Sequence, residues 1–177
     1  VPTPNRIVIE DSADFVIIHS NLGSLTNRAF AQFLGQVLTD KLGHGIIVQH
    51  DPYRIFINAM NDLSSERVVS ILEEIKYMNE TSIRDTLTLS TTKTGLFKRR
   101  IIQVARRFGA LKKWADFSNV SMQKLVSSFE GTPIYEEGLK EVFSKDLDVD
   151  GLVQIIGRLK DATTKIHVIE TGGKVTP

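Results

Sequence analysis

The chain has 177 residues with a formal net charge of +1, and its hydrophobic content of 41% suits one globular domain, or one domain with a packed helical appendage. It contains no cysteine, which excludes a disulfide framework, a thiolate metal site and a cysteine nucleophile, and which fits a reducing compartment, with the cytoplasm as the expected location. No apolar run reaches the length of a membrane span, the start lacks the basic and apolar regions of a signal peptide, and the missing initial Met suggests a piece of a longer chain.

The first third of the chain predicts two strand pairs around a single helix. We expect strand, strand, helix, strand and strand at residues 6–10, 15–20, 24–42, 46–49 and 53–58. The polar residues 11–14 predict one hairpin turn, and Pro52 pre-sets φ for a second turn. Gly43 follows the last turn of the helix, where a left-handed residue ends many helices. This β-β-α-β-β unit predicts an antiparallel sheet with the helix over one face.

The remainder of the chain is mostly helical in pattern. We expect helices at residues 65–77, 82–89, 95–114, 122–129, 133–143 and 150–159, and a last strand at residues 165–170. Thr132 is expected to cap a helix that begins with Pro133, and Asp148 caps or precedes the last helix. The predicted fold class is α+β: an antiparallel sheet from the β-β-α-β-β unit plus a C-terminal strand, packed with several helices. A strand-rich half at residues 1–61 and a helical half at residues 62–177 are expected to form one domain together.

Positive charge is concentrated between Lys93 and Lys113. These 21 residues contain eight Lys or Arg and no Asp or Glu, so they carry +8 while the other 156 residues sum to −7. A local positive field of this kind is expected to attract a polyanion such as a nucleic acid.

The predicted helix that carries most of this charge is amphipathic. At about 100° per residue, its apolar side chains form one stripe that is expected to face the core. The stripe consists of Phe97, Ile101, Val104, Ala105, Phe108 and Leu111. Arginine can bond two phosphate oxygens at once, which favours phosphate contact slightly. The candidate phosphate ligands lie opposite the stripe or on one flank: Arg99, Arg106 and Lys113 opposite, Arg100 and Arg107 on the flank.

Alternatives to nucleic-acid contact stay open from the sequence alone. A basic face is also typical of a solvated surface, or of one neutralised by acidic residues elsewhere in the fold. Carboxylates of the same molecule bound to these arginines would remove the proposed track for a polyanion. Trp114 directly follows the basic segment and is a candidate for stacking on a base. Its apolar neighbours Leu111 and Phe117 also fit a position in the core.

Three further patterns fail as sites. Residues 146–151 match the first half of an EF-hand loop, but Gly157 stands where calcium needs a bidentate Glu. Residues 172–174 resemble part of a phosphate loop, but Val168 and Val175 replace the required glycine and hydroxyl. The four histidines lack metal-ligand spacing. We therefore expect no metal site, and no constellation of acid, base and nucleophile.

Short segments in order along nearly the entire chain carry a resemblance to a known family. They are residues 7–10 (Ile-Val-Ile-Glu), 16–23 (Val-Ile-Ile-His-Ser-Asn-Leu-Gly) with Asn27 and Arg28, 51–55 (Asp-Pro-Tyr-Arg-Ile), 96–100 (Leu-Phe-Lys-Arg-Arg), 104–109 (Val-Ala-Arg-Arg-Phe-Gly), 132–137 (Thr-Pro-Ile-Tyr-Glu-Glu) with Leu139, Glu141 and Val142, and 146–148 (Asp-Leu-Asp). Together these segments resemble the DEAD/H-associated domain of large helicase-related (Lhr-type) superfamily 2 helicases.

The resemblance implies a place within a larger enzyme. In that family the domain follows two RecA-like motor domains and a winged-helix module, and it helps to enclose the strand during ATP-driven 3′-to-5′ translocation. The implied partners are single-stranded or partly duplex nucleic acid and the motor and winged-helix domains of the same chain. No cofactor is expected here, because ATP and magnesium belong to the motor domains, whose Walker A loop and acidic box this sequence lacks. The chain is therefore not expected to be an enzyme on its own. The family serves DNA repair or RNA metabolism, and the residues do not choose between them.

Two functional hypotheses follow. In the first, the chain is an accessory module of an Lhr-type helicase whose arginines and Lys113 bind phosphates. In the second, it is a structural docking module whose basic helix packs on acidic surfaces of the motor domains and does not touch nucleic acid.

Overall fold

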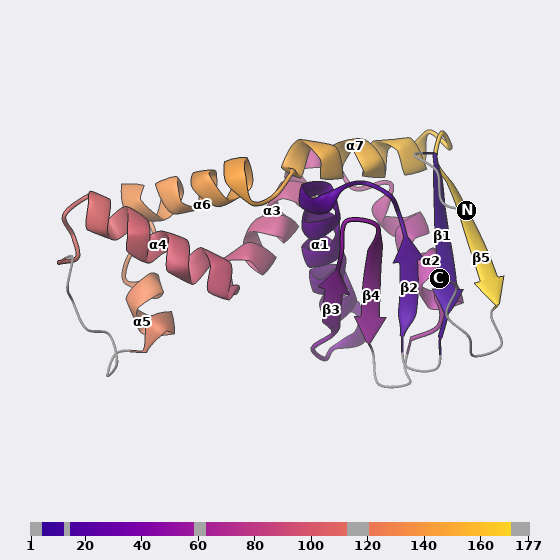
Figure 1. Cartoon of the computed structure of the whole chain (residues 1–177), viewed down its shortest axis with the longest axis horizontal. Coiled ribbons are helices and arrows are strands. Elements are labelled where there is room, and N and C mark those ends of the chain that lie inside the picture. Colours follow the sequence, from indigo (N-terminus) through magenta and orange to yellow (C-terminus); the bar gives the residue numbers. More distant parts are fainter. Residues whose placement is uncertain (1–4, 13–14, 59–62, 113–120, 171–177) are drawn as a thin grey trace. The chain divides into compact units, whose positions relative to one another are not determined.

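The computed structural model describes residues 5–12, 15–58, 63–112 and 121–170 (Figure 1). The chain divides into two compact units, which we call the sheet unit (Val1–Leu87 with Asp148–Pro177) and the helical unit (Thr88–Leu147). The predicted halves at residues 1–61 and 62–177 stay a prediction, as does their union in one domain.

The sheet unit contains a five-stranded sheet with the strand order β3-β4-β2-β1-β5. The strands are β1 (Arg6–Asp11), β2 (Val16–His19), β3 (Ile47–His50), β4 (Arg54–Asn58) and β5 (Lys165–Glu170). Three neighbouring pairs are antiparallel, and β1 and β5 run parallel. The α+β class, the β-β-α-β-β unit and the C-terminal strand are thus confirmed. The parallel pair differs from a purely antiparallel sheet. The long helical connection before β5 permits this direction, whereas a tight hairpin would allow only an antiparallel pair.

Helices cover the sheet and complete the core of this unit. The long helix α1 (Ser24–Leu42) packs on β3 and β4, and α2 (Ser65–Ile75) packs on β1 and β5. Phe30, Phe33 and Leu34 of α1 are fully buried. Strand β2 is buried at every position, so both of its faces are covered.

The remaining helices are α3 (Glu80–Thr92), α4 (Gly95–Arg107), α5 (Met122–Ser127), α6 (Pro133–Lys145) and α7 (Val149–Lys160). All the predicted helices are present, and the bounds of α1 and β5 coincide with those predicted from periodicity. The clearest difference is the end of α4, which stops at Arg107 and not at residue 114. Gly109 takes a left-handed φ of 73°, and the N–H groups of Ala110 and Leu111 both return to the Ala105 carbonyl. This tight C-terminal turn ends the helix.

Two predicted helix starts had different outcomes. Asp148 caps α7, since its Oδ1 accepts a hydrogen bond from the Gly151 N–H at 2.9 Å. Pro133 occupies the first turn of α6 as expected, but Thr132 does not cap it with its hydroxyl. That hydroxyl donates to the Phe129 carbonyl at 2.6 Å, because the turn before the helix brings this acceptor within reach.

Candidate nucleic-acid interface

The basic helix α4 is fixed in the helical unit by its apolar stripe. Phe97, Ile101, Val104 and Ala105 are fully buried, as the sequence predicts. The stripe does not continue as predicted, because Phe108 lies beyond the end of the helix and is 57% exposed. At the other end, the Thr94 hydroxyl caps the helix by accepting a hydrogen bond from the Phe97 N–H at 3.2 Å.

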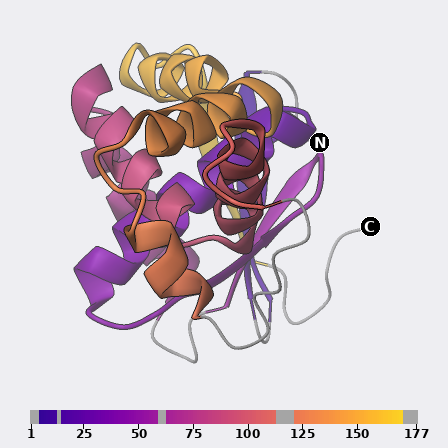
Figure 2. The same ribbon diagram turned by 90° about the vertical axis from the view of Figure 1, so that its left-hand side faces the viewer.

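A close approach between α4 and α6 sets the geometry of the site. The two helices lie side by side within the helical unit (Figure 2). A Cβ added to Gly138 of α6 would lie 2.5 Å from Cδ1 of Ile101, so glycine permits this separation. The Tyr135 ring meets Phe97 edge-on with ring centroids 5.1 Å apart. This packing places Glu141, one turn after Gly138, opposite the flank of α4 that carries Arg100 and Arg107.

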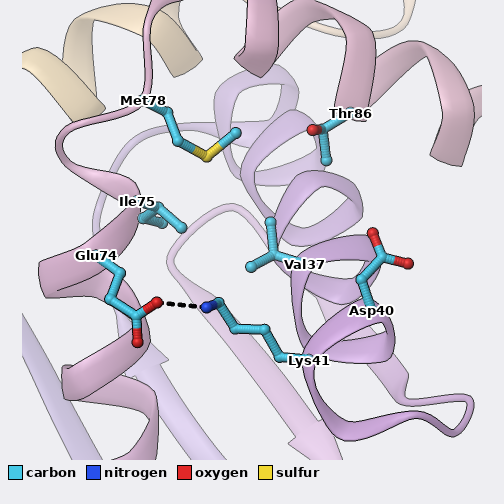
Figure 3. A pocket seen from close by; sticks show the side chains of 7 residues that line it. All are labelled: Val37, Asp40, Lys41, Glu74, Ile75, Met78 and Thr86. Carbon is cyan, nitrogen blue, oxygen red and sulfur yellow. Dashed lines mark hydrogen bonds and ion pairs between the residues drawn. The ribbon is translucent and has the colours of Figure 1, made fainter.

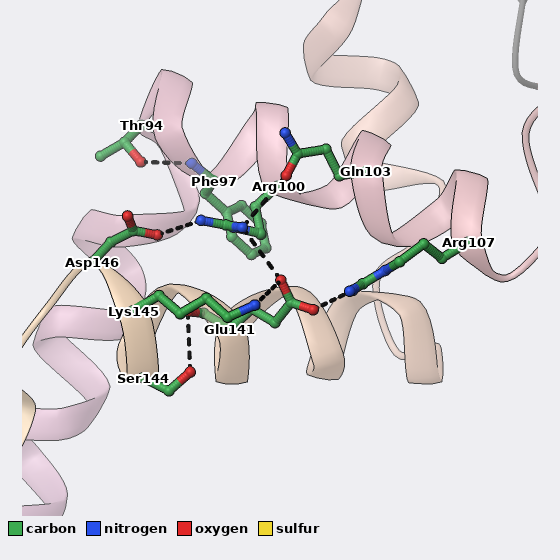
Figure 4. A network of polar contacts seen from close by, with 9 residues as sticks. All are labelled: Thr94, Phe97, Arg100, Gln103, Arg107, Glu141, Ser144, Lys145 and Asp146. Atoms are coloured by element: carbon green, nitrogen blue, oxygen red, sulfur yellow. Dashed lines mark hydrogen bonds and ion pairs between the residues drawn. The ribbon is translucent and has the colours of Figure 1, made fainter.

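Two carboxylates bind the Arg100 guanidinium: one belongs to Glu141 in α6, and the other to Asp146, the residue that follows α6 (Figure 4). Its Nη2 donates to Oδ2 of Asp146 at 2.7 Å, and its Nη1 lies 3.3 Å from Oε2 of Glu141. Only 19% of the Arg100 side chain is exposed. This guanidinium therefore ties α6 to α4.

Glu141 is the centre of the network. Its side chain is 8% exposed and also accepts hydrogen bonds from Arg107 and, at 3.2 Å, from Lys145. The hydrogen bond from Arg107 is the main reason that the pKa of Glu141 lies below its usual value. Burial acts in the opposite direction, but the cations outweigh it. Glu141 is therefore ionised at neutral pH.

The structure separates the six residues that the sequence proposed as nucleic-acid ligands. Arg99 and Arg106 are exposed on α4, on the side opposite its buried stripe. Arg107 is paired with Glu141 but keeps 54% of its side chain exposed. Carboxylates of the same molecule thus bind both Arg100 and Arg107, which is the condition that argues against a phosphate track. The Arg100 side chain is also largely covered, whereas about half of the Arg107 side chain stays exposed. Lys113 and Trp114 lie outside the described residues.

A hollow opens beside this network. It has a volume of about 520 Å³ and is lined by Arg100, Gln103, Arg106, Arg107, Glu141 and Lys145. Glu141 and Lys145 are not among the site residues predicted from the sequence. Glu141 is 34 residues from Arg107 and 41 from Arg100, so no local pattern could reveal the pairing.

Charge is unevenly shared between the two units. The helical unit contains eleven Lys or Arg and six Asp or Glu, which gives a net charge of +5. The sheet unit contains eleven Lys or Arg and fifteen Asp or Glu, which gives −4. The +8 of residues 93–113 is thus partly offset by the rest of the helical unit, which sums to −3, and the unit as a whole stays positive.

A second hollow lies in the sheet unit between α1, α2 and α3 (Figure 3). It has a volume of about 280 Å³, with Val37, Ile75 and Met78 among its apolar lining. Lys41 of α1 pairs with Glu74 of α2 at its edge, and the hydrogen bond from Lys41 lowers the pKa of Glu74. The hollow therefore has an apolar wall with the Lys41–Glu74 ion pair beside it. Its lining does not bring together an acid, a base and a nucleophile.

The described part of the chain offers neither a metal centre nor a membrane span. No group of three His, Asp or Glu side chains is placed to hold a metal ion in these residues. No helix within the same residues is long and apolar enough to span a membrane.

Comparisons with known proteins place the chain in a family. No curated protein matches. A solved structure described as "Structure of Mycobacterium smegmatis helicase Lhr bound to ssDNA and AMP-PNP" is similar, with a TM-score of 0.73 and 19% sequence identity. The similarity covers 97% of this chain but 23% of that one, so the chain spans less than a quarter of the helicase, and at this identity the likeness shows a shared fold. The model of the family described as DEAD/H associated matches residues 1–177, which confirms the resemblance noted in the sequence. The chain belongs to the DEAD/H associated family.

Proposed function

We propose that this chain is an accessory domain of an Lhr-type helicase that contacts the nucleic-acid strand through the outer side of α4. The observation that carries this proposal is the exposure of Arg99 and Arg106 opposite the buried stripe of the helix, next to the half-exposed Arg107. Lys113 and Trp114 remain part of the proposed contact by sequence. Arg100 is left out, because two carboxylates already hold its guanidinium.

The charge of the helical unit supports a polyanionic partner. A net charge of +5 on 60 residues attracts phosphates whatever the base sequence of the strand. A domain that contacts a moving strand needs affinity of this kind. The similar helicase is described as bound to ssDNA, which makes a single strand the first substrate to test. ATP hydrolysis, with ATP and magnesium, is assigned to motor domains outside this sequence, and the cytoplasm is the proposed location.

The experiment measures binding of the whole chain to a fluorescent single-stranded oligonucleotide across a salt series. Removal of one phosphate-binding side chain should reduce the slope of log affinity against log salt by about 0.7 for a single strand. We expect Arg99→Ala and Arg106→Ala each to weaken binding and to reduce the slope by about this amount. Arg67→Ala, which removes an exposed arginine from α2 of the sheet unit, is the matched control and should leave both unchanged.

The same experiment separates strand contact from docking. A chain that binds no strand at low salt, yet binds a fragment containing the motor domains, would contradict the proposal and support the docking module. Equal effects of Arg67→Ala and Arg99→Ala would show that the affinity is spread over the surface, and would also contradict a contact through α4.

A further inference from the structure

We infer that the hollow between α4 and α6 is a seat for one phosphate group of the strand, with Arg107 and Lys145 as its principal ligands. This inference rests on the proposed function, because the phosphate is that of the bound strand. It names a point of contact on α6 that the basic segment of the sequence does not contain.

The lining of the hollow is rich in positive charge. Arg100, Arg106, Arg107 and Lys145 supply four positive charges around the hollow. Glu141 in the lining and Asp146 behind Arg100 supply two negative ones. The formal charges of these six side chains sum to +2 beside a concave surface, where a compact anion reaches several cations at once.

Arg107 and Lys145 carry more hydrogen-bond donors than the network uses. Within the described residues, Arg107 and Lys145 each make a single hydrogen bond, in both cases to Glu141. A guanidinium has five N–H donors and an ammonium three. The two side chains are 54% and 55% exposed. Gln103 uses its Oε1 as the acceptor for Arg100 at 3.4 Å, which leaves its NH₂ group as a further donor.

The basic side chains of the hollow are held in place before a ligand binds. Glu141 is almost completely buried and bonded to three cations, so it holds the ends of Arg107 and Lys145 near one point before any ligand arrives (Figure 4). Long basic side chains normally lose rotamer freedom when they bind, and that cost is reduced here.

Lysine variants of α6 test the inference with a matched control. Lys140 and Lys145 are both exposed on α6, but only Lys145 lines the hollow. In the whole chain, we expect Lys145→Ala to weaken binding of a single-stranded oligonucleotide and to reduce the salt slope by about 0.7. Lys140→Ala should leave both values as in the unaltered chain. Equal behaviour of the two variants would overturn the phosphate seat.

A competition experiment distinguishes a strand phosphate from free phosphate. Inorganic phosphate should displace the oligonucleotide more than chloride does at equal ionic strength, in the unaltered chain and in Lys140→Ala. In Lys145→Ala this excess displacement should disappear. Displacement that depends on ionic strength alone would overturn the inference.

Failure of the inference is distinguishable from failure of the proposed function. If the unaltered chain binds no strand, the proposed function fails and the inference fails with it. If the chain binds the strand and Arg99→Ala weakens binding while Lys145→Ala does not, only the phosphate seat is overturned.

Discussion

Arg107 donates a hydrogen bond to Glu141, a residue 34 positions later in the chain that is almost completely buried. The pairing fixes the flank of α4 against α6 and holds a guanidinium that is still half exposed. The buried Glu141 carboxylate thus links α6 to α4 and also positions cations at the surface of the helical unit.

We predict that Glu141 makes stability depend on pH in the acid range. The folded-state pKa of Glu141 is lowered, chiefly by the hydrogen bond from Arg107. Its contribution is therefore complete above the unfolded-state pKa and is lost as pH falls through the folded-state pKa. Urea unfolding followed by circular dichroism at pH 3 to 7 should show the stability difference between the unaltered chain and Glu141→Gln shrinking as pH falls. A difference that stays constant over this range would contradict the assignment.

We predict that Arg107→Lys weakens strand binding without changing its salt slope. Lysine keeps the positive charge, so the number of counterions released is unchanged. It loses the planar fork that bonds Glu141 and a phosphate at the same time. Affinity should fall several-fold in the salt series. Arg107→Ala is the control and should lower the slope as well as the affinity.

We predict an energetic coupling between Gly138 and Ile101. A methyl group at position 138 would clash with Cδ1 of the fully buried Ile101, and overpacking of this kind costs about 1–3 kcal/mol, against a gain of about 1 kcal/mol in helix propensity. Gly138→Ala should therefore destabilise the chain. Ile101→Val removes Cδ1, so the double variant should be more stable than the sum of the single effects by about 1 kcal/mol or more. Additive free energies in chemical denaturation would contradict the close approach.

We predict that Asp148 is a stabilising residue of the sheet unit. Its carboxylate caps α7 at the Gly151 N–H and accepts a hydrogen bond from the Thr26 hydroxyl of α1 at 2.7 Å. Loss of a cap and of a hydrogen bond to a charged group together should cost about 2 kcal/mol in Asp148→Ala. Thermal denaturation measures this loss.

Two further variants check the same cap. Asp148→Asn keeps an oxygen acceptor for the Gly151 N–H and should be destabilised much less. Gly151→Ala should resemble Asp148→Ala, because a Cβ at this position would lie 2.2 Å from Oδ2 of Asp148. Full stability of Gly151→Ala would show that the carboxylate can move at no cost, and would contradict the assigned role.

Local pattern was sufficient where an element depends on its own side chains. The bounds of α1 and β5 follow from periodicity and from Gly43, whose left-handed φ of 76° ends α1. The buried residues of α4 follow from the spacing of Phe97, Ile101 and Val104. The end of α4 did not follow, because the turn at Gly109 overrode an apolar and basic pattern that continued beyond it.

The amino-acid sequence by itself determined the strand and helix order, the amphipathic character of α4 and the accumulation of positive charge around it, since each depends on residues within a few positions of one another. Only the tertiary structure decided that β5 pairs parallel with β1. It also decided which arginines are bound by carboxylates of the same unit. Those outcomes depend on contacts between distant segments. The approach of α6 at Gly138 brings Glu141 to Arg100 and Arg107, and a change of packing there would redistribute the exposed charge without altering one residue of the basic segment.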